Sequence, residues 1–161
     1  MIRESKKQGN ESFSKIGGRH MCQYEEKHKD LFEVSKEYHL AHCIATDALM
    51  GAGIAVPMKK NFGLSKTIAA AKRKELKVGT CYPEGRVLNL LTKSSSYGKP
   101  TKQSFEAAIV DMRRVVIERE IKKIAMPLIG AGLDRLSWGS NREVIQRVFA
   151  DVDVEILVCR K

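Results

Sequence analysis

The most informative stretch of the 161-residue sequence is a glycine-containing segment at residues 126–136. An apolar approach ends in two glycines one residue apart, Gly130 and Gly132, and the carboxylate of Asp134 follows. Glycine accepts positive φ angles and has no Cβ, so backbone N–H groups can converge on an anion. Such a loop can hold a phosphate or diphosphate, with Asp134 beside whatever the phosphate carries. Plain strand-to-helix turns use the same pattern, so the segment alone leaves both interpretations open.

A second glycine loop lies upstream, at residues 50–55. Two anion-binding loops in one short chain indicate a ligand with two ends, such as a nucleotide diphosphate sugar. Lys93 follows an expected strand, as both loops do, and ligands of α/β sheets bind at the carboxyl ends of strands. We therefore expect the two loops and Lys93 to meet at one edge of a sheet. Taken alone, Lys93 could equally be a solvated lysine, and Asp134 a helix N-cap or a neighbour of Arg135.

The hydrophobic pattern predicts the elements that position these residues. Strands are expected at residues 40–45, 78–81, 87–92, 124–128 and 154–159, with a turn at residues 83–85. The clearest helix follows residues 100–101, because apolar residues recur on one face at Phe105, Ala108, Ile109, Met112 and Val116. The order of elements, β-α-β-β-α-β-α-β, predicts an α/β fold with helices on both faces of the sheet.

Three further helices are predicted from local signals. One begins at Gly53 and is limited to its first turns by Pro57. The second runs from an N-cap at Ser65 to Leu76, and the last begins with a capping box at Ser140 and Glu143.

Composition indicates one globular domain, with 43% hydrophobic and 30% charged residues. No apolar stretch approaches the ~20 residues that cross a bilayer. Residues 1–10 are polar and basic and lack the apolar region of a secretory signal, so we expect an intracellular protein, in the nucleus or cytoplasm. Residues 1–22 are expected to form a disordered basic tail and residues 23–161 a single domain, monomeric because nothing in the sequence calls for a dimer.

The cysteines, histidines and charged residues argue against a metal site and against sequence-specific recognition of nucleic acid. The four cysteines form no C-x-x-C pair and the four histidines have no zinc-ligand spacing, so buried free thiols and no metal site are expected. A net charge of +10 attracts polyanions, unless it reflects only solvated helix faces and the basic tail. Aromatic residues, at 6%, are sparse for base stacking, so weak nucleic-acid contact is expected rather than sequence-specific recognition.

The sequence resembles a known family along most of its length. Residues 29–32, 40–44 and 50–55 resemble the opening of a macrodomain, a three-layer sandwich with a mixed central sheet. Residues 91–93, 99–101 and 127–138 resemble one subgroup, the terminal ADP-ribose protein glycohydrolases, which hydrolyse ADP-ribose off modified acidic side chains. The resemblance therefore implies a hydrolase that needs no cofactor and binds ADP-ribose and mono-ADP-ribosylated proteins, with weak contact to poly(ADP-ribose) through its basic surface.

The resemblance also implies roles for individual residues. Lys93 matches the nucleophile of the family and Asp134 its general acid/base, and a nucleophilic lysine needs burial or a cationic neighbour to lower its pKa. Asp30, with Leu31 beside it, matches the residue that holds the adenine amino group. The remaining ADP-ribose-binding positions follow from the two loops and their flanks: Ala45, Gly51, Ala52, Gly53, Ile54, Leu128, Ile129, Gly130, Ala131, Gly132 and Leu133.

Several positions depart from the family pattern. Residues 24–28 are polar where the family has an apolar first strand, so a short or edge strand is expected there. Ala45 stands where a serine usually contacts the ligand and Leu128 where an arginine commonly lies, and each lost polar contact weakens ADP-ribose binding by ~1 kcal/mol. Lys29 replaces a glycine, and Arg160 and Lys161 are charged where the family ends apolar.

Three functions from different classes remain open. The first is removal of mono-ADP-ribose from protein Glu or Asp, with deacylation of O-acetyl-ADP-ribose by the same geometry. The second is a module that binds ADP-ribose without turnover. The third is hydrolysis of ADP-ribose from a nucleic acid, or of ADP-ribose 1''-phosphate, for which the positive charge leaves room.

Overall fold

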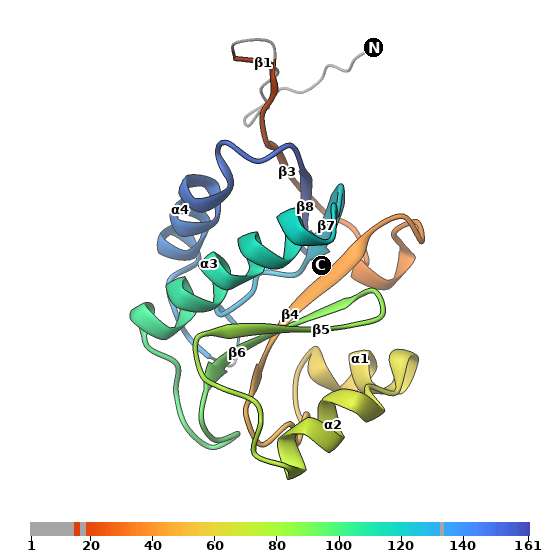
Figure 1. Cartoon of the computed structure of the whole chain (residues 1–161), viewed down its shortest axis with the longest axis vertical. Coiled ribbons are helices and arrows are strands. Elements are labelled where there is room, and N and C mark those ends of the chain that lie inside the picture. The colour runs from red at the N-terminus through yellow and green to blue at the C-terminus, as the bar shows by residue number, and fades with distance from the viewer. Residues whose placement is uncertain (1–14, 17–18, 133) are drawn as a thin grey trace.

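The computed structural model describes residues 15–16, 19–132 and 134–161 and contains a six-stranded mixed sheet (Figure 1). Along the sheet the strands are β3 (Gln23–Lys27), β8 (Glu155–Cys159), β7 (Lys123–Met126), β4 (His39–Ala45), β6 (Val87–Lys93) and β5 (Thr80–Glu84). All neighbouring strands are parallel except β5 and β6, which form an antiparallel hairpin. The predicted mixed sheet is therefore confirmed.

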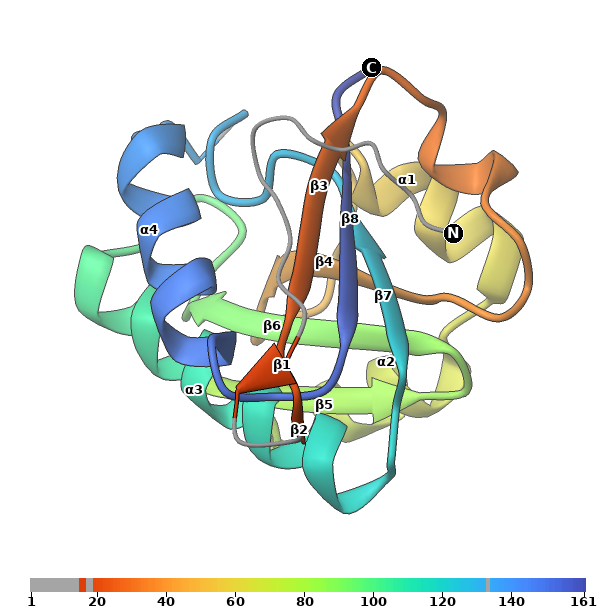
Figure 2. The same cartoon turned by 90° about the horizontal axis from the view of Figure 1, so that it is seen from above.

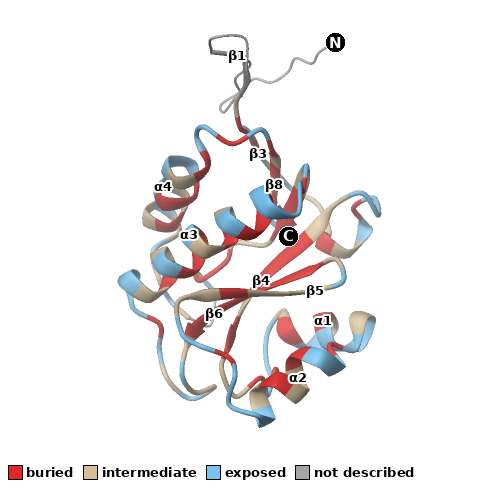
Figure 3. Ribbon diagram, viewed as in Figure 1, coloured by how far each residue is buried: buried red, intermediate tan, exposed pale blue. Residues whose placement is uncertain are grey.

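Helices cover both faces of this sheet, so the fold is the expected three-layer sandwich. Helices α3 (Lys102–Glu118) and α4 (Trp138–Phe149) lie on one face, and α1 (Ala55–Phe62) and α2 (Ser65–Lys72) on the other. Figure 2 shows the strong twist of the sheet, in which β3, β8 and β7 run across the direction of β5 and β6. Figure 3 shows that the buried residues lie where the helices face the sheet.

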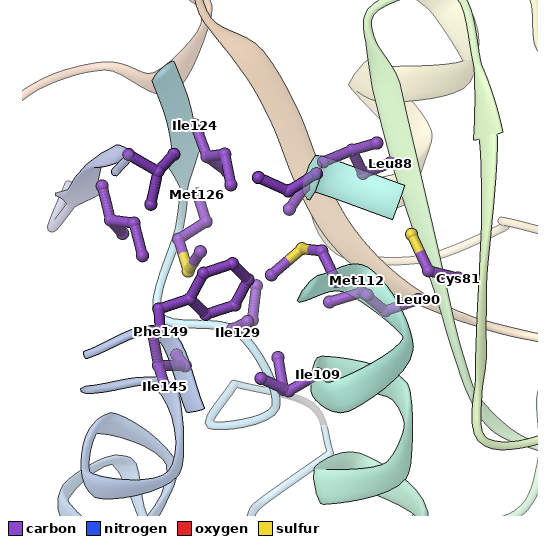
Figure 4. Packing of buried hydrophobic residues seen from close by; sticks show 14 of the residues in the cluster. Cys81, Leu88, Leu90, Ile109, Met112, Ile124, Met126, Ile129, Ile145 and Phe149 are labelled. Atoms are coloured by element: carbon purple, nitrogen blue, oxygen red, sulfur yellow. The ribbon is translucent and has the colours of Figure 1, made fainter. Parts of the chain in front are cut away.

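Two hydrophobic cores, one on each face of the sheet, hold the layers together. The first fills the space between the sheet and helices α3 and α4, where Phe149 of α4 lies among Met112, Met126 and Ile129 (Figure 4). All five residues of the predicted α3 stripe are buried, which confirms that helix. The second core includes Leu40, Met58 and Leu91, and it packs α1 and α2 against the opposite face.

The ends of α2 differ from the prediction at both sides. Ser65 is the first helical residue rather than the N-cap, because the carboxylate of Glu84 from β5 accepts the amide N–H groups of Lys66 and Thr67. The helix stops at Lys72, where Lys74 adopts a φ of 60° and Glu75 N–H bonds to the carbonyl of Ala70. This closing turn ends the helix before Leu76.

Other predicted boundaries also shift by a few residues. The last helix begins at Trp138, because Ser137 accepts the N–H of Ser140; the predicted capping box at Ser140 and Glu143 is wrong. Strand β5 starts at Thr80 rather than Val78 and includes the predicted turn residues Pro83 and Glu84. Strand β7 ends before Pro127, which cannot donate to a neighbouring strand. Helix α1 begins at Ala55 and continues to Phe62, because Pro57 lies in its first turn, where the missing N–H is not needed.

The polar first strand, β3, lies at the edge of the sheet as expected, and its polarity has a structural reason. The carboxylate of Glu26 accepts hydrogen bonds from Tyr24 Oη, Trp138 Nε1 and Arg142 Nε, and forms an ion pair with Arg160. One acidic side chain therefore fastens the edge strand to the start of α4 and to the residue after β8.

Two short strands lie in the predicted tail. Lys15–Ile16 (β1) and Arg19–His20 (β2) pair antiparallel within the predicted tail, most of which lies outside the described residues. The expected boundary at residue 22 stays a prediction. All four cysteines are free, and all except the half-buried Cys43 are buried. No helix among the described residues combines the length and apolar character that a membrane crossing requires.

A buried polar chain joins β4 to α2 through the sheet. His42 Nε2 lies 2.7 Å from Asn89 Oδ1, and Asn89 Nδ2 donates to Thr67 Oγ1, which donates to Glu84. His42 is fully buried, and its Nδ1 has no partner among the described residues. Burial, only partly opposed by the Asn89 hydrogen bond, lowers the pKa of His42 to about 4. The folded protein therefore holds this imidazole neutral.

His42 makes stability depend on pH in a defined direction. Its pKa is lower in the folded state (about 4) than in the unfolded state (~6.5), so stability is fully present above pH ~6.5 and falls as the pH drops toward 4. Between pH 7.5 and pH 5 this residue removes about 2 kcal/mol of unfolding free energy. Urea denaturation of the wild type and His42→Gln at both pH values measures the effect. Equal pH dependence in the two proteins contradicts it.

Gly130, in the loop between β7 and α4, is required by packing as well as by conformation. Its φ is 75°, and an added Cβ would lie 2.7 Å from Asn141 Nδ2 and 3.2 Å from the ring of Phe105. Asn141 in turn donates to the carbonyl of Ile129. The loop can therefore lie flat against α3 and α4 only with a glycine at this position. Gly132, two residues on, has open space around the position of its missing Cβ.

This difference predicts unequal costs for two similar substitutions. Gly130→Ala should lower the free energy of unfolding by about 2–4 kcal/mol, from the positive φ and the overpacked Cβ. Gly132→Ala should change it by about 0.5 kcal/mol or less, because nothing opposes the methyl group. Chemical denaturation of both variants beside the wild type checks the prediction. A Gly130→Ala protein as stable as Gly132→Ala would show that the loop adjusts freely.

Candidate functional site

The carboxyl ends of β4, β6 and β7 meet at one edge of the sheet and bring the predicted residues together. Lys93 is the last residue of β6, and Asp134 lies in the loop after β7. Lys93 Nζ donates to Asp134 Oδ1 at 2.9 Å, and the two side chains are only 16% and 13% exposed. Lys93 and Asp134 are therefore in direct contact and largely shielded from water, and their catalytic roles stay a prediction.

A bulge in the sheet immediately precedes Lys93. Strands β4 and β6 pair regularly as far as Ile44 with Leu91, but Ala45 then pairs with Lys93, so Thr92 is an extra residue. Thr92 is buried, and its hydroxyl has no partner among the described residues. Bulges break the alternation of side chains and redirect the next residue, and they recur beside active sites. Here the bulge lies directly before the residue that meets Asp134.

The first glycine loop leads into a helix whose amino end lacks a side-chain cap. Met50 and Gly53 have positive φ angles of 51° and 62°, and Ile54 forms no capping hydrogen bond through its side chain. Gly51, Ala52 and Gly53 are exposed, and Ile54 is half-buried. Backbone N–H groups at the start of α1 are thus open to an anion, which the helix dipole also attracts.

The second glycine loop follows β7 and contributes Asp134. It is closed by hydrogen bonds from Leu136 N–H to Gly130 O (2.8 Å) and from Arg135 N–H to Gly132 O (3.1 Å). Ile129 and Gly130 are buried, Ala131 is half-buried and Gly132 is exposed. The predicted ligand residue Leu133 lies outside the described residues. Gly130, Ala131 and Gly132, which precede the carboxylate of Asp134 in this loop, therefore carry no side chain larger than a methyl group.

Asp30 lies at the far end of the same edge, after β3. Its Oδ1 accepts the Phe32 N–H at 2.9 Å, where it caps the short helix η1 (Leu31–Glu33). Its Oδ2 faces Lys161 Nζ at 3.4 Å. The Phe32 hydrogen bond, with a smaller contribution from Lys161, lowers the pKa of Asp30. Leu31 is buried in the core on the α1 and α2 side, so only its backbone is available to a ligand.

Ala45 and Leu128 provide no polar atoms from their side chains. Ala45 is 4% exposed at the end of β4, and the side chain of Leu128 packs against the core beneath α3 and α4. The expected loss of two polar ligand contacts is therefore built into the site. Of the two surroundings expected for Lys93, burial or a cationic neighbour, the structure provides low exposure, and its hydrogen-bond partner is an anion, the carboxylate of Asp134.

Sequence reasoning missed two residues that surround the pair. Asp47 holds the loop after Lys93 through two hydrogen bonds to Ser96. The two residues are 49 positions apart, so no local sequence pattern predicts this contact. Cys43 on β4 lies behind the pair, and burial together with the nearby Asp134 carboxylate raises the pKa of its thiol, which stays protonated. Among the described residues, no group of three His, Cys, Asp or Glu side chains could hold a metal ion.

Comparison with known proteins gives this geometry its context. No protein-family model matches the chain. Human ADP-ribose glycohydrolase OARD1 is 37% identical over 130 residues, which cover 80% of this chain and 86% of the relative, and its Bos taurus counterpart is 35% identical over the same shares.

Solved structures show the same fold. The macrodomain of Thermus aquaticus DarG superposes with a TM-score of 0.78 at 23% identity, over 87% of this chain and 99% of that structure. Thermosipho africanus DarTG, solved in complex with ADP-ribose, gives a TM-score of 0.68 at 20% identity over 78% of this chain and 39% of that one. With the paired lysine and aspartate between two glycine loops, these similarities establish that the chain belongs to the macrodomain family and, within it, to the terminal ADP-ribose protein glycohydrolases, which are hydrolases.

Proposed function

We propose that this ADP-ribose glycohydrolase releases mono-ADP-ribose from Glu or Asp side chains of modified proteins, with Lys93 as the nucleophile and Asp134 as the general acid/base. One observation supports this assignment above the others: Lys93 Nζ lies 2.9 Å from Asp134 Oδ1 at the edge where both glycine loops emerge. A module that only binds ADP-ribose needs the loops but has no use for a shielded amine–carboxylate pair.

The arrangement along the edge suggests how ADP-ribose lies. Asp30 would accept the adenine amino group at one end, and the amides of residues 51–54 and 129–132 would surround the diphosphate. The distal ribose then reaches Lys93 and Asp134, so its anomeric carbon stands beside the amine. Because Lys161 already contacts Asp30 Oδ2, the adenine amino group must share or displace that contact.

The chemistry follows from the reactivity of an amine toward an anomeric carbon. The neutral amine of Lys93 forms a C–N bond to C1'' of the ribose while the C1''–O bond to the protein carboxylate breaks. The carboxylate leaves with the bonding electrons. The ring bond between C1'' and O4'' then breaks, O4'' takes a proton from the attacking nitrogen, and the opened sugar remains as a protonated Schiff base on Lys93. Water then adds to C1'', the C–N bond breaks, and ADP-ribose and the free amine are restored.

Asp134 can accept the proton that Lys93 must lose before it attacks. The ammonium form of Lys93 cannot attack, and the carboxylate of Asp134 is the base already within hydrogen-bonding distance. It takes the proton before attack and can return it when the Schiff base is hydrolysed. The low exposure of both side chains keeps bulk water from competing with this exchange.

Other ADP-ribose linkages fit the same pair. Deacylation of O-acetyl-ADP-ribose would instead break the acyl C–O bond by addition of water to the ester carbonyl, with Asp134 taking the proton of that water. In the Lys93 route, a terminal phosphate or a nucleic-acid base could replace the protein carboxylate as leaving group. The net charge of +10 favours the nucleic-acid linkage among these alternatives, because a phosphate backbone is attracted to a basic protein.

Release of ADP-ribose from a Glu-modified protein tests the proposal. Lys93→Ala and Asp134→Asn should each lower kcat by at least ~100-fold, the scale of a lost nucleophile or acid/base group. Binding of free ADP-ribose, measured by calorimetry, should change far less. Lys36→Ala, an exposed lysine before β4 at the opposite edge of the sheet, should keep wild-type kcat.

The outcomes separate the alternatives. The melting temperature of each variant should also be measured, because breaking a shielded ion pair can destabilise the fold. A wild type that binds ADP-ribose but releases none from the Glu-modified protein excludes the Glu/Asp hydrolase. A Lys93→Ala protein that is folded and retains full turnover excludes the lysine mechanism.

A further inference from the structure

The carboxylate of Glu26 gathers donors from several elements at the edge of the sheet where the candidate site lies. Glu26 is near the carboxyl end of β3, and its side chain is only 16% exposed. Its Oε2 accepts hydrogen bonds from Tyr24 Oη at 2.6 Å, Trp138 Nε1 at 3.2 Å and Arg142 Nε at 2.7 Å. Its Oε1 accepts from Arg160 Nη1 at 2.7 Å. Groups from β3, α4 and the residue after β8 therefore meet on one carboxylate.

The structure holds Glu26 as an anion. Burial raises the pKa of this carboxyl, but hydrogen bonds from Arg142, Tyr24 and Arg160 outweigh burial, and the pKa is lowered. Ion pairs of this kind add little net stability, because the loss of hydration offsets the attraction. An apolar side chain could attach β3 to α4 equally well. What the carboxylate adds is a defined position for each of its donors.

The donors from α4 lead to the loop that carries Asp134. Trp138 is the first residue of α4 and follows Asp134 closely in the sequence. Between them the chain passes through Arg135, whose φ of 63° is strained for a residue with a Cβ. Arg142 lies one turn further along α4, with its guanidinium 5.9 Å from the centre of the Trp138 ring. The indole is therefore held by Glu26 at its N–H and by Arg142 over its face.

The two ends of the second glycine loop are attached in different ways. Near its start, Asn141 Nδ2 donates to the carbonyl of Ile129. At its end, Trp138 Nε1 donates to Glu26 of the edge strand. Asp134 lies between these attachments, so a movement of Trp138 would shift its carboxylate relative to the reacting amine. A misplacement of about 1 Å in a catalytic group can lower the rate ~100-fold.

We propose that Glu26 is a positioning residue for the hydrolysis. Through Trp138 and Arg142 it holds the end of the second glycine loop. This hold keeps the Asp134 carboxylate against the amine of Lys93. Glu26 itself takes no part in bond making or proton transfer. The inference rests on the proposed function only for the role of Asp134, and the hold on Trp138 can be measured without turnover.

Glu26→Gln tests the inference by kinetics, because this change keeps the shape of the side chain and removes its charge. It should lower kcat for release of ADP-ribose from a Glu-modified protein by ~10–100-fold, the scale of a misplaced catalytic group. The Kd of free ADP-ribose should rise less than about threefold, because backbone amides of both loops surround the diphosphate. Arg142→Met should also lower kcat. The double variant should stay within about threefold of Glu26→Gln, because both changes break the same contact.

Trp138 is the only tryptophan in the sequence, so its fluorescence reports on this contact without any substrate. Acrylamide should quench the emission more strongly in Glu26→Gln and Arg142→Met than in the wild type, because the released indole is more accessible. Glu25→Gln is the matched control, since it makes the same change at the next position of β3, where the exposed side chain pairs with Lys27. It should keep wild-type kcat and wild-type quenching.

A folded Glu26→Gln protein with wild-type kcat, assayed well below its melting temperature, overturns the inference. A lower melting temperature with unchanged kcat would give Glu26 a structural role only. An equal loss of kcat in Glu25→Gln would also contradict the inference, because the effect would then belong to the charge of β3 rather than to the contact with Trp138.

Failure of this inference is distinguishable from failure of the proposed hydrolase. If the wild type releases no ADP-ribose from the Glu-modified protein, the Glu/Asp assignment fails, and quenching alone decides the hold on Trp138. Unchanged quenching in Glu26→Gln then refutes the inference. If the wild type is active and Glu26→Gln retains full kcat, this inference alone fails.

Discussion

Parallel pairing of β4 with β6 and β7 is the constraint on which the rest of the structure depends. Parallel strands end at the same edge, so residues far apart in the sequence, Ala45, Lys93 and the loop after Met126, meet there. The two buried cores hold this pairing from both faces. The bulge at Thr92 then alters the register at the last step, directly before Lys93. The positions of the candidate catalytic residues therefore follow from this strand pairing.

The site combines a shielded ion pair with open backbone. Lys93 and Asp134 are mostly removed from water, where a charge without its partner would be costly. The glycine loops beside them expose amides to solvent at the start of α1 and around Gly132. An anionic ligand would satisfy these amides and exclude water from the pair. Binding of the ligand would therefore also shield the proton exchange between Lys93 and Asp134 from water.

How much could be predicted from the sequence depends on how local each signal is. The α3 stripe and the strand that leads to Lys93 rest on residue types and spacing within one segment, and the structure confirms both, with Lys93 as the last residue of β6. The anion-binding role of the two glycine loops rests on equally local signals and stays a prediction. Glu84 capping α2 and Asp47 holding Ser96 connect residues from different elements, so no window of sequence contains both partners. The N-cap proposed at Ser65 fails for this reason: a distant carboxylate supplies what a local serine was expected to supply.

The polar residues of β3 likewise have partners that are distant in the sequence. The polar stretch at β3 departs from an apolar pattern, yet Glu26 is saturated by donors from α4 and from Arg160, which only the fold brings near. Asp30 is assigned by resemblance to the family, whereas the edge that it shares with the two glycine loops follows from the sheet order. Ala45 and Leu128 remain apolar in the site and provide none of the polar contacts that the family pattern has there.

Trapping the intermediate would show whether Lys93 forms a covalent bond to ADP-ribose. The wild type would be mixed with Glu-ADP-ribosylated protein in the presence of borohydride, digested and analysed by mass spectrometry. Borohydride should reduce a Schiff base to a stable amine, so we expect ADP-ribose on the peptide that contains Lys93, and none in Lys93→Arg. Turnover with no adduct on Lys93, or an adduct on another lysine, would contradict it.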